Sequence, residues 1–214
     1  MLKFLELTGQ GVLEFPEGSE FKRYEGSFRK GRFHGRGVLT FSGGLILGCP
    51  WKEGNPVEND AMLISPGGEM KYLGEIMGLV PKGKGTLHYQ GFALSGTWDG
   101  FNPVGRTARI VTDCSEYEGE VKEMKMHGKG VLRRFDGSSY RGDFVEGRFH
   151  GRGVFTDTDG SSYHGDFAHG MFDGYGTQTD RSGRVIYAGL WEENKISSVR
   201  RNRGASFNEN VIHL

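Results

Sequence analysis

A phosphate-binding pattern is the first chemical signal in the sequence. The segment GLVPKGKGT, which begins at Gly78, contains the spacing G-x-x-x-x-G-K that cradles phosphate in nucleotide-binding proteins. The residue after Lys84 should then be Ser or Thr, to hold Mg²⁺, but Gly85 stands there. The surrounding segments also read as strands, without a helix whose N-terminus would bind phosphate. We therefore predict no nucleotide and no other cofactor.

Three histidines recur in phase and suggest a metal site. His34, His127 and His150 each precede a glycine at the same place in a repeated segment. Equivalent positions in successive hairpins lie ~10 Å apart, because two strands separate them. Zinc needs each nitrogen at ~2 Å, so these side chains cannot share one ion. We predict instead that each imidazole bonds a backbone group of its own loop, and that no metal is bound.

Nucleophiles and carboxylates form no catalytic set. Neither Cys49 nor Cys114 has a neighbouring histidine, and Cys114 stands where other units have a turn glycine. The carboxylates alternate with basic residues along strands, as Arg141 and Asp143 do, which is typical of a solvated sheet face. The sequence predicts a protein that is not an enzyme. Two cysteines without a metal-ligand spacing favour free thiols and a cytoplasmic location.

Composition favours a thin fold rather than one thick core. The 214 residues include 37 glycines but only 6 prolines, and 12% are aromatic. The formal net charge is zero, whereas proteins that bind nucleic acid carry a basic excess, so we predict no nucleic-acid partner. The apolar start MLKFLEL is too short and too charged to predict a signal peptide or a membrane span.

One segment repeats along almost the whole chain. The residues from Tyr140 read YRGDFVEGRFHGRG, and those from Tyr163 read YHGDFAHGMFDGYG. Tyr24 and Tyr117 open further close copies. Weaker copies open at Ile46, where one extra residue precedes Trp51, and at three more positions, namely Tyr72, Leu94 and Tyr187. Such steady spacing indicates a repeat architecture.

Each unit reads as a β-hairpin. Tyr140, Gly142 and Phe144 share one face of a strand, and Asp136-Gly137 suits the tight turn before it. Glycine inside a strand needs a reason, and we expect it to leave room for an aromatic ring from the neighbouring unit. Stacked hairpins support one another, so the predicted fold is all-β: an elongated, solenoid-like antiparallel sheet. Eight units would span on the order of 75 Å.

These residues resemble the MORN (membrane occupation and recognition nexus) repeat, with the pattern Y-x-G-x-[FW]-x-x-G-x-x-x-G-x-G. The resemblance covers residues 9 to about 195. It divides the chain into an N-terminal partial repeat or cap (1–23), a repeat array (24–194) and a C-terminal cap or tail (195–214). Within the array, the repeats are regular at 24–45 and 117–186 and degenerate at 46–116.

The resemblance implies a structural scaffold that binds proteins in a groove of aromatic and glycine residues. A helix held in the groove, a larger cytoskeletal or axonemal assembly and a second copy of the chain are the partners it implies. The location it implies is the cytoskeleton, above all of cilia or flagella. The predicted groove residues are the unit-opening tyrosines and one loop position, namely Tyr24, Phe33, Tyr72, Tyr117, Met126, Tyr140, Phe149, Tyr163 and Phe172. Both sets also fit a second interpretation, in which they form the core.

Two other functions stay open. The first is an adaptor for membranes or phosphoinositides, because Arg32, Arg36, Arg148 and Arg152 flank the loops and could form a basic row. The second is a regulatory subunit of an enzyme supplied by another chain, because MORN arrays precede catalytic domains in some methyltransferases and lipid kinases.

Overall fold

The computed structural model describes residues 7–197, and its strands form one open antiparallel sheet of 18 strands. The predicted all-β array of hairpins is confirmed. The strands are β1 (Gly9–Glu14), β2 (Phe21–Arg29), β3 (Arg32–Phe41), β4 (Ile46–Lys52), β5 (Asn55–Pro56), β6 (Ala61–Ile64), β7 (Met70–Met77), β8 (Val80–Tyr89), β9 (Phe92–Asp99), β10 (Asn102–Val111), β11 (Ser115–Lys122), β12 (Lys125–Arg134), β13 (Ser139–Val145), β14 (Arg148–Thr156), β15 (Ser162–Ala168), β16 (Met171–Thr179), β17 (Val185–Glu192) and β18 (Lys195–Ile196).

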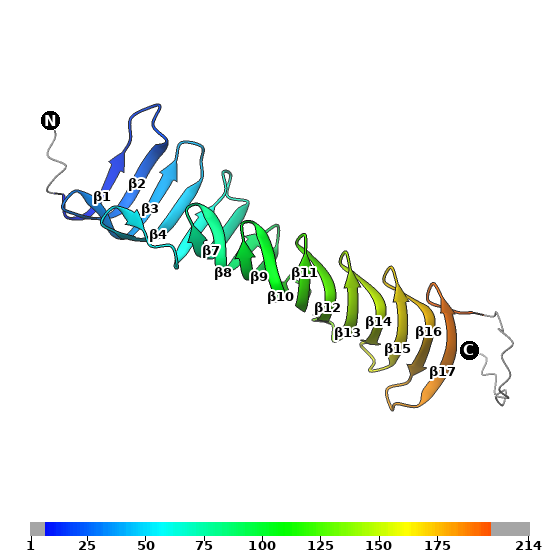
Figure 1. Ribbon diagram of the computed structural model, residues 1–214. Helices are drawn as coiled ribbons and strands as arrows, with labels where there is room; N and C mark the ends of the chain where they lie inside the picture. The colour runs from blue at the N-terminus through cyan, green and yellow to red at the C-terminus, as the bar shows by residue number, and fades with distance from the viewer. Residues whose placement is uncertain (1–6, 198–214) are drawn as a thin grey trace, which may run out of the picture.

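The strands follow one another along the long axis in chain order (Figure 1). Each long strand pairs with the strands before and after it, and the short β5 lies beside β4, which also pairs with β6. The partial repeat at the N-terminus supplies β1, which pairs with β2. Residues 198–214 of the predicted cap or tail lie outside the described residues. No helix in residues 7–197 is long and apolar enough to cross a membrane.

Two kinds of turn alternate along the sheet. The predicted turn at Asp136-Gly137 is present: the Gly137 amide donates to the Arg134 carbonyl at 3.1 Å, and Gly137 has φ of 100°. The turn inside each unit was not predicted. Glu146 and Gly147 both have positive φ there, 49° and 81°, which is the backbone of a two-residue type I′ turn. Equivalent pairs of positive φ angles occur at Lys30-Gly31 and at His169-Gly170.

A buried tyrosine ring lies over two glycines in each regular unit. In the unit of Tyr140, a Cβ added to Gly142 would lie 2.5 Å from the tyrosine oxygen, and one added to Gly153 would clash with the same ring. Gly142 and Gly153 are paired across β13 and β14. Both glycines belong to the tyrosine's own unit, so the expectation that the ring comes from the neighbouring unit is wrong.

The tyrosine hydroxyl is bonded inside the sheet. That of Tyr140 donates toward the carbonyl oxygens of Asp143 and His150, at 3.0 and 3.1 Å. These carbonyls lie where the register of β13 and β14 shifts. The hydroxyl therefore satisfies backbone acceptors that the shift takes out of the regular ladder.

A carboxylate accompanies the same irregularity. Beyond Gly142 the register jumps, so that Asp143 lies opposite His150. The freed amide of Arg152 donates to Asp143 Oδ2 at 3.2 Å, and Gly151, with φ of 54°, leaves the space that this carboxylate fills. Glu120 and Asp166 bond the corresponding amides, those of Lys129 and Tyr175, at 3.1 Å. Bulges bend strands, and β12 to β17 are visibly curved (Figure 1).

Aromatic contacts join one unit to the next. The Tyr140 ring stacks on Phe149 of its own unit, with centroids 3.9 Å apart, and meets Phe167 of the next unit edge-on at 4.9 Å. Tyr117 meets Phe144 in the same edge-on way at 5.0 Å. Such pairs contribute about 0.5–1.5 kcal/mol beyond their burial. The buried residues fall into two clusters, one from Tyr24 to Ala108 and one from Tyr117 to Trp191.

The second unit opens at Leu47 and not at Ile46. Leu47 pairs with Leu39 and Leu63, and it lies buried in the same row of the sheet as the tyrosines that open the flanking units. With this start Trp51 has the regular spacing. Cys49 then takes the first glycine position, opposite Gly37, where it is buried.

The glycines beneath the ring should not tolerate even one added methyl group. We expect Gly142→Ala to lower the free energy of unfolding by about 2 kcal/mol, since the new Cβ would lie 2.6 Å from the Arg152 carbonyl oxygen. For a chain of this length the melting temperature would fall by roughly 4–8 °C. The matched control is Gly43→Ala, because a Cβ at Gly43 meets nothing within 4 Å. Equal melting temperatures for the two variants would contradict the packing described.

Candidate functional site

The predicted groove residues all lie on one face of the sheet, here called the aromatic face. The five tyrosines among them are at most 1% exposed, namely Tyr24, Tyr72, Tyr117, Tyr140 and Tyr163. Side chains buried to this degree cannot contact a partner in this conformation. The tyrosines are therefore core residues, which corrects their assignment to a partner-binding surface.

The loop residues form an outer layer over these tyrosines. Phe33 stacks on Tyr24 with centroids 3.6 Å apart, and Phe172 stacks on Tyr163 at 3.8 Å. Like Phe149, both phenylalanines remain half-buried, so each presents part of its ring to solvent. A role of this layer in partner binding stays a prediction.

The aromatic face is hollowed where the two core clusters meet. A cavity of about 290 Å³ lies between β9 and β13. Its lining is mainly apolar and includes two methionines and one lysine. The lining residues are Phe92, Ile110, Thr112, Ser115, Tyr117, Met124, Lys125, Met126, Leu132 and Gly147. Two of the predicted groove residues, Tyr117 and Met126, are thus brought together here.

Substitutions in two adjacent units produce this hollow. The unit before it has Leu94 in place of the opening tyrosine and Pro103 in place of the loop phenylalanine. The unit after it has Val121 and Met126 where the unit of Tyr140 has Phe144 and Phe149. The rings that fill the aromatic face elsewhere are therefore missing from this point.

The backbone is strained beside the hollow. Met124 has φ of 62° in the type I′ turn, where the unit of Tyr140 has Gly147. A side chain other than Gly, Asn or Asp rarely adopts this conformation, which costs of order 1 kcal/mol. Turn residues of other units, such as Glu146, have the same left-handed backbone, so the conformation belongs to the turn. At Met124 it places a flexible thioether at the cavity wall. Sequence reasoning missed Met124, although a methionine at a turn glycine's position was a visible signal.

The histidines do not behave as predicted. No hydrogen bond of the described residues joins the imidazole of His34, His127 or His150 to its own loop backbone. Nδ1 of His34 is buried without a hydrogen-bond partner and lies 3.9 Å from Glu53 Oε1. The backbone carbonyls of His127 and His150, and not their imidazole rings, form the hydrogen bonds here. They accept from the hydroxyls of Tyr117 and Tyr140.

Ion pairs neutralise most of the expected basic row. Three of its four arginines face carboxylates: Arg32 faces Glu53 at 3.9 Å, Arg36 faces Asp60 at 3.0 Å and Arg152 faces Asp166 at 3.4 Å. Within residues 7–197, no group of three or more His, Cys, Asp or Glu side chains could hold a metal ion.

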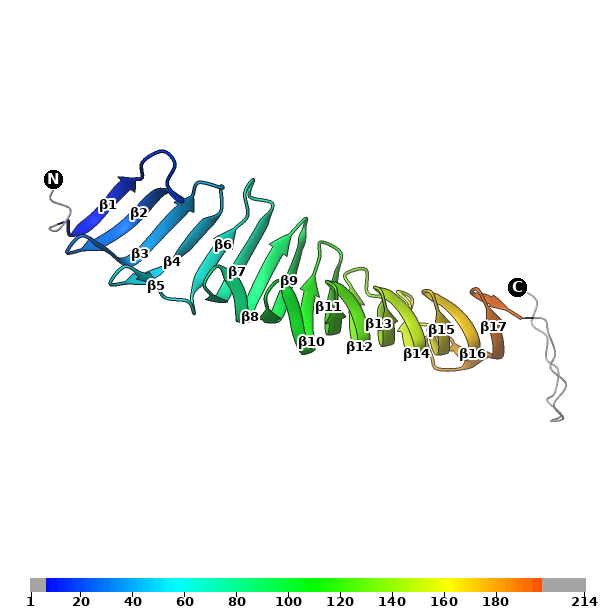
Figure 2. The same ribbon diagram turned by 45° about the horizontal axis from the view of Figure 1, so that its top comes forward.

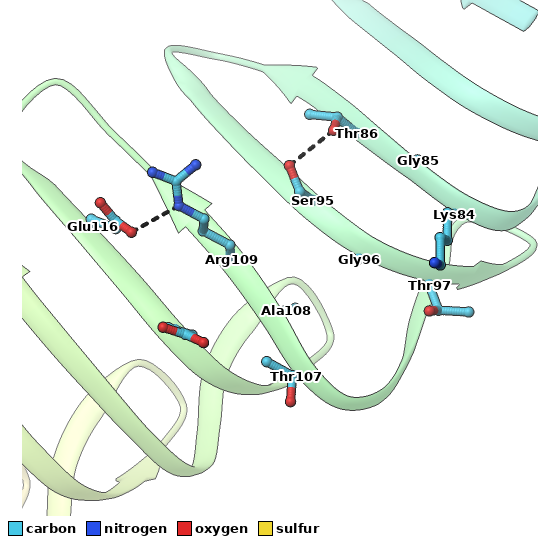
Figure 3. A pocket seen from close by; sticks show the side chains of 11 residues that line it. Lys84, Gly85, Thr86, Ser95, Gly96, Thr97, Thr107, Ala108, Arg109 and Glu116 are labelled. Atoms are coloured by element: carbon cyan, nitrogen blue, oxygen red, sulfur yellow. Dashed lines mark hydrogen bonds and ion pairs between the residues drawn. The ribbon is translucent and has the colours of Figure 1, made fainter. Parts of the chain in front are cut away.

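The segment with the phosphate-binding pattern runs from the turn at Gly78 into β8, in the strand context that the sequence predicted. Lys84 and Thr86 line a shallow hollow of about 660 Å³ on the face opposite the aromatic face (Figure 3). Four of its polar side chains bond one another: Thr86 meets Ser95 at 2.9 Å, and Arg109 donates to Glu116 at 2.8 Å. We assign no ligand to this hollow.

An open sheet of hairpins, most of them closed by a tyrosine over paired glycines, defines a β-hairpin repeat protein. The MORN repeat family model matches residues 24–46, 117–139, 140–162 and 163–183. The chain therefore contains MORN repeats at these four places. Proteins with MORN repeats serve in protein interaction and scaffolding, and the repeat is generally non-catalytic. Comparison with curated proteins finds no match.

The buried phenols should make the fold sensitive to alkali. Burial raises the pKa of five tyrosines to about 12, namely Tyr24, Tyr72, Tyr117, Tyr140 and Tyr163. Since the folded-state pKa lies above the ordinary value of 10.0, their contribution to stability is complete below pH 10 and is lost as pH rises toward 12. We expect the free energy of unfolding to fall steeply between pH 10 and about 12. Denaturant titrations at a series of pH values measure this free energy, and absorbance of the tyrosinate form reports ionisation of the phenols.

A pair of variants tests the cause. Tyr140→Phe should make the alkaline loss less steep, because one buried phenol is gone. Tyr175→Phe should not change it, since that ring is 63% exposed. The same slope in both variants would show that the buried phenols do not control alkaline unfolding.

Proposed function

We propose that this protein is a non-catalytic scaffold that binds a partner protein on its aromatic face. The observation that carries the proposal is the hollow of about 290 Å³, which suits one or two apolar side chains of a partner. Two methionines in its lining give it an adaptable surface of the kind used to bind proteins.

The arrangement also supports a partner longer than the hollow. The half-buried rings of Phe33, Phe149 and Phe172 recur at intervals along the same face, so a helix or filament could contact several units. We further propose that the partner belongs to the cytoskeleton, in particular that of cilia or flagella. The resemblance to MORN scaffolds supports this location.

Ion pairing lowers the support for binding to an anionic membrane. Arg36 and Arg152 lie beside carboxylates on the sheet surface, so little uncompensated positive charge is left for lipid headgroups. The aromatic face is therefore the better candidate surface.

The first test is retention in a ciliated cell after mild detergent has removed the membranes. We expect the tagged protein to stay with the insoluble cytoskeleton. Met124→Gly should release it into the supernatant, because the variant removes a methionine from the hollow. Stability should stay within about 1 kcal/mol of wild type, since relief of the turn strain offsets the lost contacts.

Met77→Ala is the matched control, because Met77 is 63% exposed on another unit. It should be retained like the wild type. Loss of the wild-type protein to the supernatant would argue against the cytoskeletal scaffold. Equal retention of both variants would show that the hollow does not hold the partner.

A photoreactive residue placed at position 126 can then identify the contact. Crosslinks from position 126 and none from position 77 would place a partner at the hollow. The reverse pattern would move the binding surface away from it.

A further inference from the structure

The face opposite the aromatic face carries an apolar patch at its N-terminal end. Cross-strand pairs place Val38, Gly48, Met62 and Leu73 in one row across β3, β4, β6 and β7. Ile46 and Ile64 are paired in the next row. We call Val38, Ile46, Met62, Ile64 and Leu73 the back patch.

These side chains point away from the core. Along each strand they alternate with residues of the buried row, namely Leu39, Leu47, Leu63 and Tyr72. Successive side chains of a strand lie on opposite faces, so the back patch lies on the other side of the sheet. Val38 and Leu73 are 37% and 38% exposed, and the other three are half-buried.

The regular repeats lack this patch. In the second cluster the valines Val131 and Val154 lie apart from each other among polar residues of the same row, namely Glu118, Arg141, His164 and Thr177. The other row is polar, with Arg133, Ser139, Thr156 and Ser162. An antiparallel sheet commonly packs one face and leaves the other in water. A sheet that is apolar on both faces therefore indicates that something covers the second face.

Gly48 leaves no gap within the back patch. Gly48 has no side chain, and the Met62 methyl group occupies the space above it: a Cβ at Gly48 would lie 2.8 Å from Met62 Cε. Figure 2 shows β1 to β4 and β6 side by side in the broadest part of the sheet. Two such faces can stack ~10 Å apart with their strands nearly aligned.

We propose that the back patch packs against the same patch of a second copy of this chain, around a two-fold axis parallel to the strands. Two-fold packing places each residue of β3 opposite one of β7, and each of β4 opposite one of β6. Val38 then faces Leu73 of the second copy, and Ile46 faces its Ile64. Met62 of each copy covers its own Gly48, so the two flexible methionine side chains meet near the axis.

Charges beside the patch fit the same arrangement. Arg36 lies two residues before Val38 on β3, and Glu75 lies two residues after Leu73 on β7. The two-fold axis brings Arg36 of each copy opposite Glu75 of the other, so this charge pair forms twice. The Arg36 side chain is 83% exposed, and among residues 7–197 its ion-pair partner is the exposed Asp60, which leaves it accessible to a second carboxylate.

Sedimentation velocity of the full chain tests the dimer, over concentrations from about 1 to 100 µM. We expect the wild type to dimerise within this range. Leu73→Lys should weaken dimerisation by at least about tenfold, because it places a charge in the patch. The matched control is Val154→Lys, which changes an equally exposed residue of the same row in a regular unit and should leave dimerisation unchanged. Circular dichroism of both variants is the check that they fold.

Charge reversal tests the two-fold arrangement itself. Arg36→Glu and Glu75→Arg should each weaken the dimer, and the double variant should restore it, because the pairs form again with reversed sign. A wild type that stays monomeric throughout the range overturns the proposal and leaves the patch to a different protein. Equal effects of Leu73→Lys and Val154→Lys also overturn it. A double variant weaker than either single one rejects this two-fold arrangement.

Discussion

The sheet depends on one contact, the tyrosine ring that lies over two paired glycines. The ring fits only because both positions lack a Cβ, and its hydroxyl then reaches backbone carbonyls at the irregularity between the strands. Burial, hydrogen bonding and backbone geometry are thereby satisfied by one side chain. The high glycine content follows from this contact and from the turns. The surrounding rings complete the core because the tyrosine presents one flat face for stacking and its edges to the next unit.

Both specialised features arise where this contact is missing. Units that open with Leu47 and Leu94 have no phenol ring to fit, so Cys49 can occupy a glycine position and Pro103 can replace a ring. The hollow on the aromatic face and the back patch both lie in or beside this part of the chain. The regular units thus supply a uniform support, and the degenerate units supply surfaces that differ from it.

The repeat made the fold predictable, but it did not reveal how each side chain is used. Spacing identified Tyr140, Gly142 and Phe144 as one face of a strand, yet the ring covers glycines of its own hairpin, because the register shift brings Gly153 beside Gly142. Periodicity shows that the tyrosines share one face of the strands, but it does not show whether that face is buried or exposed, because both cases give the same spacing. The hollow depends on what four successive strands, β9 to β12, leave unfilled, and the back patch appears only when cross-strand partners are known. Both surfaces depend on which residues pair across the strands, and the repeat motif does not specify this.

The strictly sequential pairing of strands has a consequence for how such a molecule changes over evolution. Because every hairpin contacts mainly its neighbours in the chain, duplication or loss of one whole unit would alter the length by ~10 Å while leaving every other contact in place. The length of the protein can thus change in fixed increments of one hairpin unit. Surfaces carried by individual units would keep their chemistry, but the distance between them would be reset.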